Sequence, residues 1–253
     1  MASSRGAHPD DASLFAPSER PTLRAAVADL SWLRTRGYGD AAAQTLVGDR
    51  YRLTRRQRNA VGRLACGDAV AAHRRVRRRR PSALAGEWLE IDGFNVLITL
   101  EGALGGAYSF VGRDGAVRDV NPVQGTYRPV ADTDRAIQAV GAVARRHGLE
   151  GLVWRLDDHV SNVGRLRARL DARRPEGLGW RIRVQDHVDR ALRDSDRTVA
   201  TSDSGILDDV RRWCALERAV YAQLPAEPHV CDLRPPEGAG GRIEVPGPRR
   251  SPT

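Results

Sequence analysis

The sequence predicts an α/β fold: a mostly parallel sheet with helices on both faces, preceded by a small helical module. Three observations lead to this prediction. Short apolar stretches alternate with helical ones across residues 86–233, a pattern typical of a parallel sheet covered by helices. Residues 21–80 repeat apolar side chains at helical spacing only. Pro81 marks the change from one pattern to the other.

Composition narrows the class of protein. The 253 residues carry a formal net charge of +9, and every basic residue other than histidine is an arginine. Arginine binds phosphate through two parallel hydrogen bonds, which favours a polyanionic partner, although a general arginine bias of the genome would give the same count. No apolar run approaches the roughly 20 residues of a membrane helix. The three cysteines form no C-x-x-C pair, which excludes a zinc ribbon. We expect a cytoplasmic protein without a membrane partner, and the oligomeric state stays open.

The first 80 residues are expected to hold a disordered leader and then helices. Residues 1–20 are rich in Ser, Pro and Asp and predict the leader, and residues 234–253 predict a disordered tail. Asp40 is expected to cap a helix over 41–47, and Thr54 one over 55–66. This pair has helix-turn-helix proportions, but a simple packing module explains it equally well. The arginine-rich run 73–80 predicts a solvated linker or, alternatively, a grip on a phosphate backbone.

The α/β part is predicted element by element. Apolar strands are expected at 88–91, 152–156, 180–184 and 198–200. Helices are expected at 96–104, 133–147 and 163–173, the last capped by Ser161, with a short one through Leu207. Residues 107–120 predict a hairpin that turns at Asp114 and Gly115.

Four aspartates follow the predicted strands. Asp92 and Asp157 end two of them, Asp189 opens a helix after the third, and Asp203 lies just beyond the fourth. The carboxyl ends of parallel strands form the ligand crevice of such sheets, so these side chains are expected to converge. Grouped carboxylates repel one another, and Mg²⁺ or Mn²⁺ relieves that repulsion. For any one of these aspartates a helix cap is the better explanation, but four at one edge of the sheet favour a metal site.

Three segments carry a resemblance to a known family. Residues 90–97 (EIDGFNVL), 187–194 (HVDRALRD) and 199–204 (VATSDS) resemble motifs of the PIN-like superfamily, especially its NYN branch. The resemblance implies a Rossmann-like fold and a Mg²⁺- or Mn²⁺-dependent ribonuclease in which Asp92, Asp189 and Asp203 bind metal. The supporting polar residues are Asn95, Ser161, Thr201 and Ser202, with Glu101 and Asp208 as weaker acidic candidates. The chain also resembles an uncharacterised prokaryotic family with an L-x-x-R-Q-R segment, here residues 53–58.

Two features depart from the NYN pattern. Ser204 and Gly205 stand where that branch commonly has a second aspartate, and the hairpin over 107–120 is expected to be an insertion. His159 and His187 flank the site and are interpreted as hydrogen-bonding bystanders.

The site supports two functional hypotheses. The first is a metal-dependent nuclease that cuts phosphodiester bonds in RNA rather than DNA, with Asp92, Asp157, Asp189 and Asp203 as metal ligands. Nearby arginines would contact the nucleic acid, namely Arg155, Arg165, Arg190 and Arg197. The second is a catalytically inactive PIN-like nucleic-acid-binding or interaction protein.

Overall fold

A six-stranded parallel sheet forms the centre of the α/β part. The computed structural model describes residues 5–120 and 127–236. The strand order is β1-β8-β7-β2-β5-β6, and every neighbouring pair is parallel. The strands are β1 (Arg78–Arg79), β2 (Trp88–Asp92), β5 (Gly151–Asp157), β6 (Gly179–Gln185), β7 (Thr198–Ala200) and β8 (Trp213–Cys214). The predicted α/β class with a parallel sheet is confirmed.

Helices lie on both faces of this sheet because side chains of a strand alternate between faces. Ala200 belongs to the main hydrophobic core with residues of four helices, α6 (Gly93–Leu104), α7 (Thr133–Arg146), α8 (Val163–Ala172) and α11 (Leu216–Tyr221). Val199, its neighbour in β7, packs instead with residues of α9 (Val188–Arg193) and α10 (Ser204–Leu207). Strand β8, helix α11 and the last strand of the chain were not predicted.

The N-terminal helices form a core of their own. They are α1 (Asp11–Leu14), α2 (Arg20–Thr35), α3 (Asp40–Arg50) and α4 (Arg55–Leu64). Thr54 caps α4 as predicted, and the Gln57 side chain accepts a hydrogen bond from the Thr54 backbone N–H in return. Asp40 begins α3 as its first helical residue, and the cap position belongs to Gly39.

The predicted disordered leader is wrong for its described part, residues 5–20. Phe15 is fully buried in the core of the helical module, and the buried Asp11 forms an ion pair with Arg56. An aromatic side chain and a paired carboxylate thus anchor a segment whose composition alone is that of a loop. Residues 1–4 of that leader, and 237–253 of the predicted tail, lie outside the described residues.

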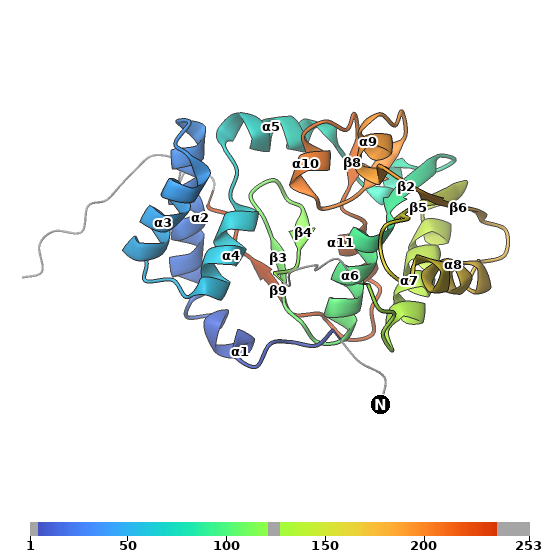
Figure 1. Cartoon of the computed structure of the whole chain (residues 1–253), viewed down its shortest axis with the longest axis horizontal. Helices are drawn as coiled ribbons and strands as arrows, with labels where there is room; N and C mark the ends of the chain where they lie inside the picture. Colours follow the sequence, from blue (N-terminus) through green and yellow to red (C-terminus); the bar gives the residue numbers. More distant parts are fainter. Residues whose placement is uncertain (1–4, 121–126, 237–253) are drawn as a thin grey trace, which may run out of the picture.

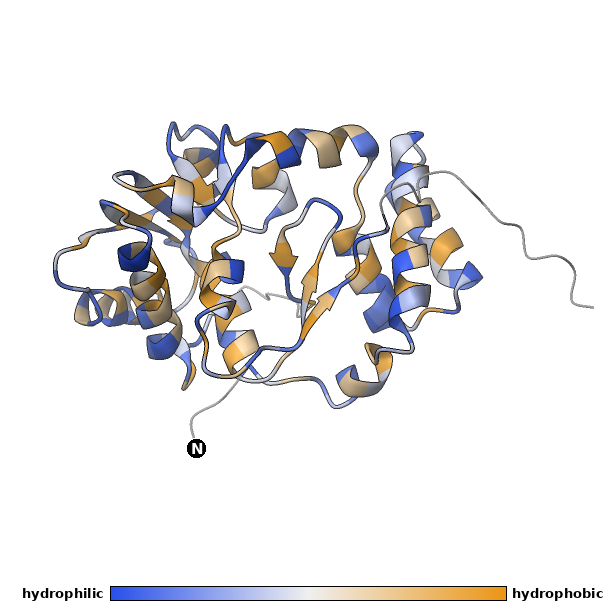
Figure 2. Ribbon diagram, turned by 180° about the vertical axis from the view of Figure 1, so that it is seen from behind, coloured by the Kyte–Doolittle hydropathy of each residue, from blue (hydrophilic) through white to orange (hydrophobic). Residues whose placement is uncertain are grey.

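A small second sheet joins the two parts. The predicted hairpin is confirmed as β3 (Ser109–Val111) and β4 (Val117–Arg118), and β9 (Val230–Asp232) pairs parallel with β3. Phe110 of β3 lies 4.6 Å from Phe15, ring centre to ring centre, inside the core of the helical module. Figure 2 shows the strands of this sheet in hydrophobic colours, between the N-terminal helices and the rest of the chain.

The run 73–80 is not a solvated linker. Residues 68–77 form α5 (Asp68–Arg77), which crosses above the hairpin toward α10 (Figure 1), and Arg78 and Arg79 form the edge strand β1. A short 3₁₀ turn, η1 (Pro81–Ala83), comes next. Arg74 is only 4% exposed because it finds carboxylate partners, which a charge count along the chain does not reveal. None of the described helices is both long and apolar enough to cross a membrane.

Candidate functional site

Two adjacent central strands end in a linked pair of loops. Asp92 ends β2, and residues 201–203 come directly after β7, its parallel neighbour. The Thr201 hydroxyl donates a 2.7 Å hydrogen bond to Asp92 Oδ2 and accepts one of 3.1 Å from the Asp203 backbone N–H. Asn95 Oδ1 accepts from both the backbone N–H and the hydroxyl of Ser202, each at 2.9 Å. Five of the predicted site residues therefore meet at the carboxyl ends of β2 and β7, and we call this cluster the crevice after the place that it occupies in a parallel sheet.

The crevice concentrates negative charge around Asp92. The pKa of Asp92 is raised to about 7, chiefly by burial and also by the charges of Asp203 and Asp189, against the lowering effect of the Thr201 hydrogen bond. Asp189 is exposed in the first turn of α9, a helix that packs against β2. Three of the four predicted aspartates are thus close enough for their charges to interact.

Asp203 is both a helix cap and a crevice residue. Its Oδ1 accepts hydrogen bonds from the backbone N–H groups of Gly205 at 2.7 Å and Ile206 at 3.3 Å. Its Oδ2 has no hydrogen bond to any described residue, and the residue is exposed. The cap holds one oxygen and leaves the other available to a ligand.

Sequence reasoning missed a fourth acidic residue, Glu217. It lies in the first turn of α11, three residues after β8, and is 0% exposed. Both of its carboxylate oxygens are buried without a hydrogen-bond partner among the described residues. The pKa of Glu217 is raised to about 7, chiefly by burial and also by the charge of Asp92, whereas its own backbone N–H and the charges of Arg118 and Arg78 lower it. Strand β8 has only two residues, which is too short for a recognisable strand pattern. Glu217 could therefore not be identified as a residue that follows a strand.

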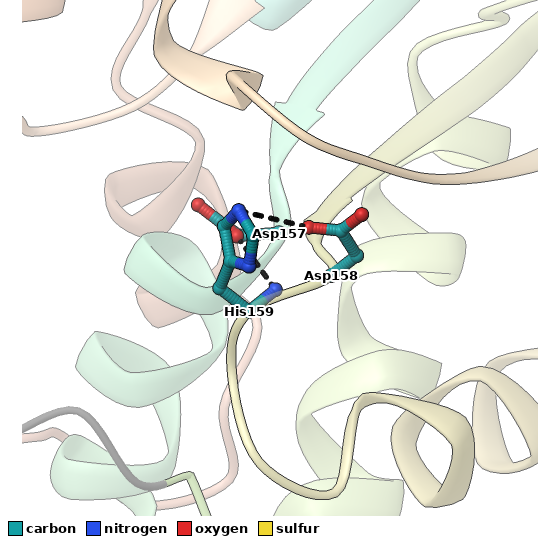
Figure 3. A group of neighbouring side chains, drawn as sticks. All are labelled: Asp157, Asp158 and His159. Carbon is teal, nitrogen blue, oxygen red and sulfur yellow. Dashed lines mark hydrogen bonds and ion pairs between the residues drawn. The ribbon is translucent and has the colours of Figure 1, made fainter.

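Asp157 lies in a different cluster. The register of β5 places Arg155 beside Asp92, so Asp157 leaves the sheet two residues farther along. Its Oδ1 accepts from the His159 backbone N–H at 2.9 Å, and it groups with Asp158 and His159 (Figure 3). Among the described residues, this is the one group of three or more such side chains with ligand atoms all within 4.8 Å of one another.

The two histidines belong to this exposed cluster and do not reach the crevice through any hydrogen bond between described residues. His159 Nε2 lies 3.0 Å from Asp186 Oδ1, and His187 Nε2 lies 3.0 Å from Asp186 Oδ2. Both histidines and Asp186 are exposed at the ends of β5 and β6. Solvent screening makes such pairs weak, so these contacts orient side chains without a large contribution to stability.

The hairpin, which was predicted to be an insertion, helps to hold the loop after β7 in place. Its turn buries Asp114, which accepts hydrogen bonds from Arg74 at 2.7 Å and from Arg118 at 3.0 and 2.7 Å. Arg118 Nε also donates to the Ser202 carbonyl at 2.9 Å, and Arg74 Nη2 donates to the Ser204 carbonyl at 3.0 Å. The loop that carries Asp203 is therefore held by two buried arginines that share one buried aspartate.

The remaining acidic and capping candidates have structural partners. Asp208 accepts from Arg74 Nε at 2.8 Å, so it belongs to the support network. Glu101 is fully buried two turns along α6, where it pairs with Arg5 and accepts from the Thr133 hydroxyl at 2.6 Å. Ser161 does not cap α8, because Asn162 occupies the cap position at φ 66°.

Two of the four arginines predicted to contact nucleic acid are bound within the protein. Arg155 donates two hydrogen bonds to the buried Glu90, at 2.7 and 3.0 Å, and Arg197 lies 3.4 Å from the same carboxylate. Arg190 forms an exposed pair with Asp194 at 3.6 Å. Arg165 is exposed and has no ion pair to any described residue.

Comparison with known proteins finds relatives without an assigned activity. A family model described as "Domain of unknown function (DUF5616)" matches residues 81–219, more than half of the chain. A second, described as "Protein of unknown function (DUF434)", matches residues 22–77. An uncharacterized protein of Methanocaldococcus jannaschii is 27% identical over 190 residues, which are 74% of this chain and 89% of that protein. No solved structure matches the chain.

Proposed function

This chain belongs to the family of the domain of unknown function DUF5616, and from the chemistry of its crevice we propose that it is a divalent-metal-dependent nuclease acting on RNA. The observation that supports the proposal most strongly is Glu217. A buried carboxylate with two unpartnered oxygens is costly, and a bound cation removes that cost. Asp92 and Asp203 provide further oxygen donors at the same edge of the sheet, within the influence of Asp189.

The donor set fits Mg²⁺ or Mn²⁺. All four side chains are carboxylates, and hard divalent cations prefer oxygen ligands. Mg²⁺ retains several waters, so the carboxylates need not all touch the ion, which agrees with their open arrangement. We assign Asp92, Asp203 and Glu217 to metal binding, with Asp189 at the rim. The PIN-like resemblance of residues 90–97 and 199–204 remains part of the proposal.

The hydrogen bonds indicate which residues would orient the metal ligands and which would balance their charge. A bound metal would supply an activated water and stabilise charge on a phosphate oxygen. Thr201 holds Asp92 Oδ2, and Asn95 holds the Ser202 backbone, so both residues orient ligands. Arg118, buried against the same loop, keeps positive charge beneath the carboxylates.

A second candidate function is nucleic-acid binding without catalysis. Ser204 and Gly205, where the NYN branch commonly has an acid, favour it. It predicts RNA binding that falls with salt but is unchanged by EDTA, and no cleavage with any divalent metal.

The test of the nuclease is a calorimetric titration with Mn²⁺, with an RNA-cleavage assay of the same samples. We expect Asp92→Asn and Glu217→Gln each to weaken Mn²⁺ binding by about tenfold or more and to lose cleavage. Asp157→Asn tests whether Mn²⁺ binds instead at the cluster of Asp157, Asp158 and His159. We expect this variant to bind Mn²⁺ and to cleave RNA as wild type does. Glu176→Gln, an exposed change on the loop after α8, controls for lost charge. The proposal is refuted if Asp157→Asn loses Mn²⁺ binding while Asp92→Asn keeps it.

A further prediction concerns Thr201, whose hydroxyl contacts both Asp92 and the backbone N–H of Asp203. Thr201→Val keeps the shape of this buried side chain and removes both hydrogen bonds. Partners that orient metal ligands typically contribute a factor of about 10–100 in metal affinity, so we expect the Mn²⁺ dissociation constant to rise by that amount. The melting temperature of metal-free protein serves as the check on folding. An unchanged Mn²⁺ affinity would show that the Thr201 contact does not position a ligand.

A further inference from the structure

A second cavity, beside edge strand β1, is lined mainly by arginine. Its volume is about 740 Å³. Segments far apart in sequence contribute to it: α5, β1 and the turn after it, the first turn of α11, and the residues after β9. The arginines are Arg75, Arg78, Arg79, Arg80, Arg218 and Arg234. We call this cavity the arginine pocket.

The positive charge of the arginine pocket is poorly balanced by the protein. Of its arginines, only Arg234 has a carboxylate within ion-pair distance among the described residues, namely Asp232. Arg79 donates to the backbone carbonyls of Val76 and Arg78, and Arg75 to that of Arg113. Burial lowers the pKa of Arg78, and the neighbouring positive charges of Arg218, Arg234 and Arg80 lower it further.

The arginines of the arginine pocket differ in their ion pairing from several arginines elsewhere in the protein. Several buried or half-buried arginines elsewhere are matched to carboxylates, as Arg155 is to Glu90 and Arg118 to Asp114. Like charges that converge on a cavity without such partners repel one another and attract anions. Guanidinium groups match phosphate in particular, because they donate two parallel hydrogen bonds.

The first turn of α11 links the arginine pocket to the crevice. Glu217 is fully buried, and its pKa is raised by the charge of Asp92 and lowered by that of Arg78. Arg218, the next residue, is exposed and lines the arginine pocket. Adjacent residues of α11 therefore belong to the two places, Glu217 to the acidic cluster and Arg218 to the arginine pocket.

We propose that the arginine pocket binds backbone phosphates of the RNA whose neighbouring phosphodiester lies at the crevice. This inference rests on the proposed nuclease function for its choice of RNA. It assigns substrate contacts to Arg78, Arg80 and Arg218, in place of Arg155 and Arg197, which are bound to Glu90. Phosphate contacts of this kind position the strand without reading its sequence.

The test is binding of a fluorescent single-stranded RNA to the full chain, measured by anisotropy in EDTA. The pocket variant is Arg80→Gln with Arg218→Gln, both exposed. The matched control is Arg167→Gln with Arg183→Gln, which removes the same charge from α8 and β6, at the opposite edge of the sheet. We expect the pocket variant to weaken RNA binding by about tenfold or more, and the control to remain near wild type.

Salt dependence gives a second readout of the same contacts. Loss of two phosphate contacts should reduce the slope of log affinity against log salt by about 1.4. Equal affinities and slopes for the pocket variant and its control would overturn the proposal. So would tight binding of inorganic pyrophosphate that the pocket variant abolishes while its RNA affinity is unchanged, because the cavity would then be a small-anion site.

Failure of the nuclease proposal has a different signature. EDTA removes metal from the binding assay, so RNA binding through the arginine pocket survives even if Mn²⁺ neither binds nor supports cleavage. Where cleavage is observed, the pocket variant should raise KM with kcat near wild type, whereas Asp92→Asn should lower kcat.

Discussion

Asp114→Asn should lower the free energy of unfolding by about 3–5 kcal/mol, because it leaves two buried arginines without their shared counter-charge. Asp114 is 2% exposed, and Arg74 and Arg118 are 4% and 2% exposed. The two guanidinium groups hold the pKa of Asp114 well below its usual range, so the carboxylate is ionised throughout the pH range of the folded protein. Urea unfolding measured at neutral pH provides the check.

The control for Asp114 is an ion pair on the same turn. Arg113 pairs with Asp68, whose side chain is exposed, so Asp68→Asn should cost no more than about 1 kcal/mol. A stability of Asp114→Asn equal to that of Asp68→Asn would contradict the network as described. Because Arg118 and Arg74 also hold the carbonyls of Ser202 and Ser204, we expect folded Asp114→Asn to bind Mn²⁺ more weakly as well.

Glu217→Gln should stabilise the metal-free protein at alkaline pH by about 3 kcal/mol, since the pKa rise from 4.5 to about 7 is a cost of burying the charge. The sign is set by proton linkage. The folded state binds the Glu217 proton more tightly than the unfolded state does, so wild-type stability falls as the pH rises from about 4.5 to about 7. Glutamine stays neutral, and the difference between variant and wild type should vanish below that range.

Urea unfolding of both proteins in EDTA, from about pH 4 to pH 8, measures this difference. Glu176→Gln should show no such pH dependence, because Glu176 is exposed. Saturating Mn²⁺ should reverse the order and make wild type the more stable, since a ligand stabilises the state that binds it. A Glu217→Gln protein whose stability parallels wild type at every pH would show that folding does not raise the pKa of Glu217.

The sequence by itself determined the class of fold and every residue of the crevice except Glu217. The alternation of strands and helices across residues 86–233 predicted the parallel sheet, because burial on both faces forces that pattern. Asp92 and Asp203 were found because they lie at or just after the ends of strands, and Asn95, Thr201 and Ser202 because they stand beside them in recognisable motifs. Thr54 could be predicted as a helix cap because its hydrogen bonds are made with Gln57, only three residues away.

Only the tertiary structure decided the contacts made between distant segments. Glu217 joined the crevice because β8 lies next to β7, an adjacency that no local pattern encodes. Asp157 came to group with Asp158 and His159, two residues beyond the level of Asp92 in the strand register, which spacing along the chain cannot show. Arg74, Asp114 and Arg118 became a buried support, and four other arginines of the run 73–80 became part of a pocket. The physical reason is common to all three cases: the environment of a charged side chain is set by its neighbours in space, and solvation or pairing cannot be inferred from charge alone.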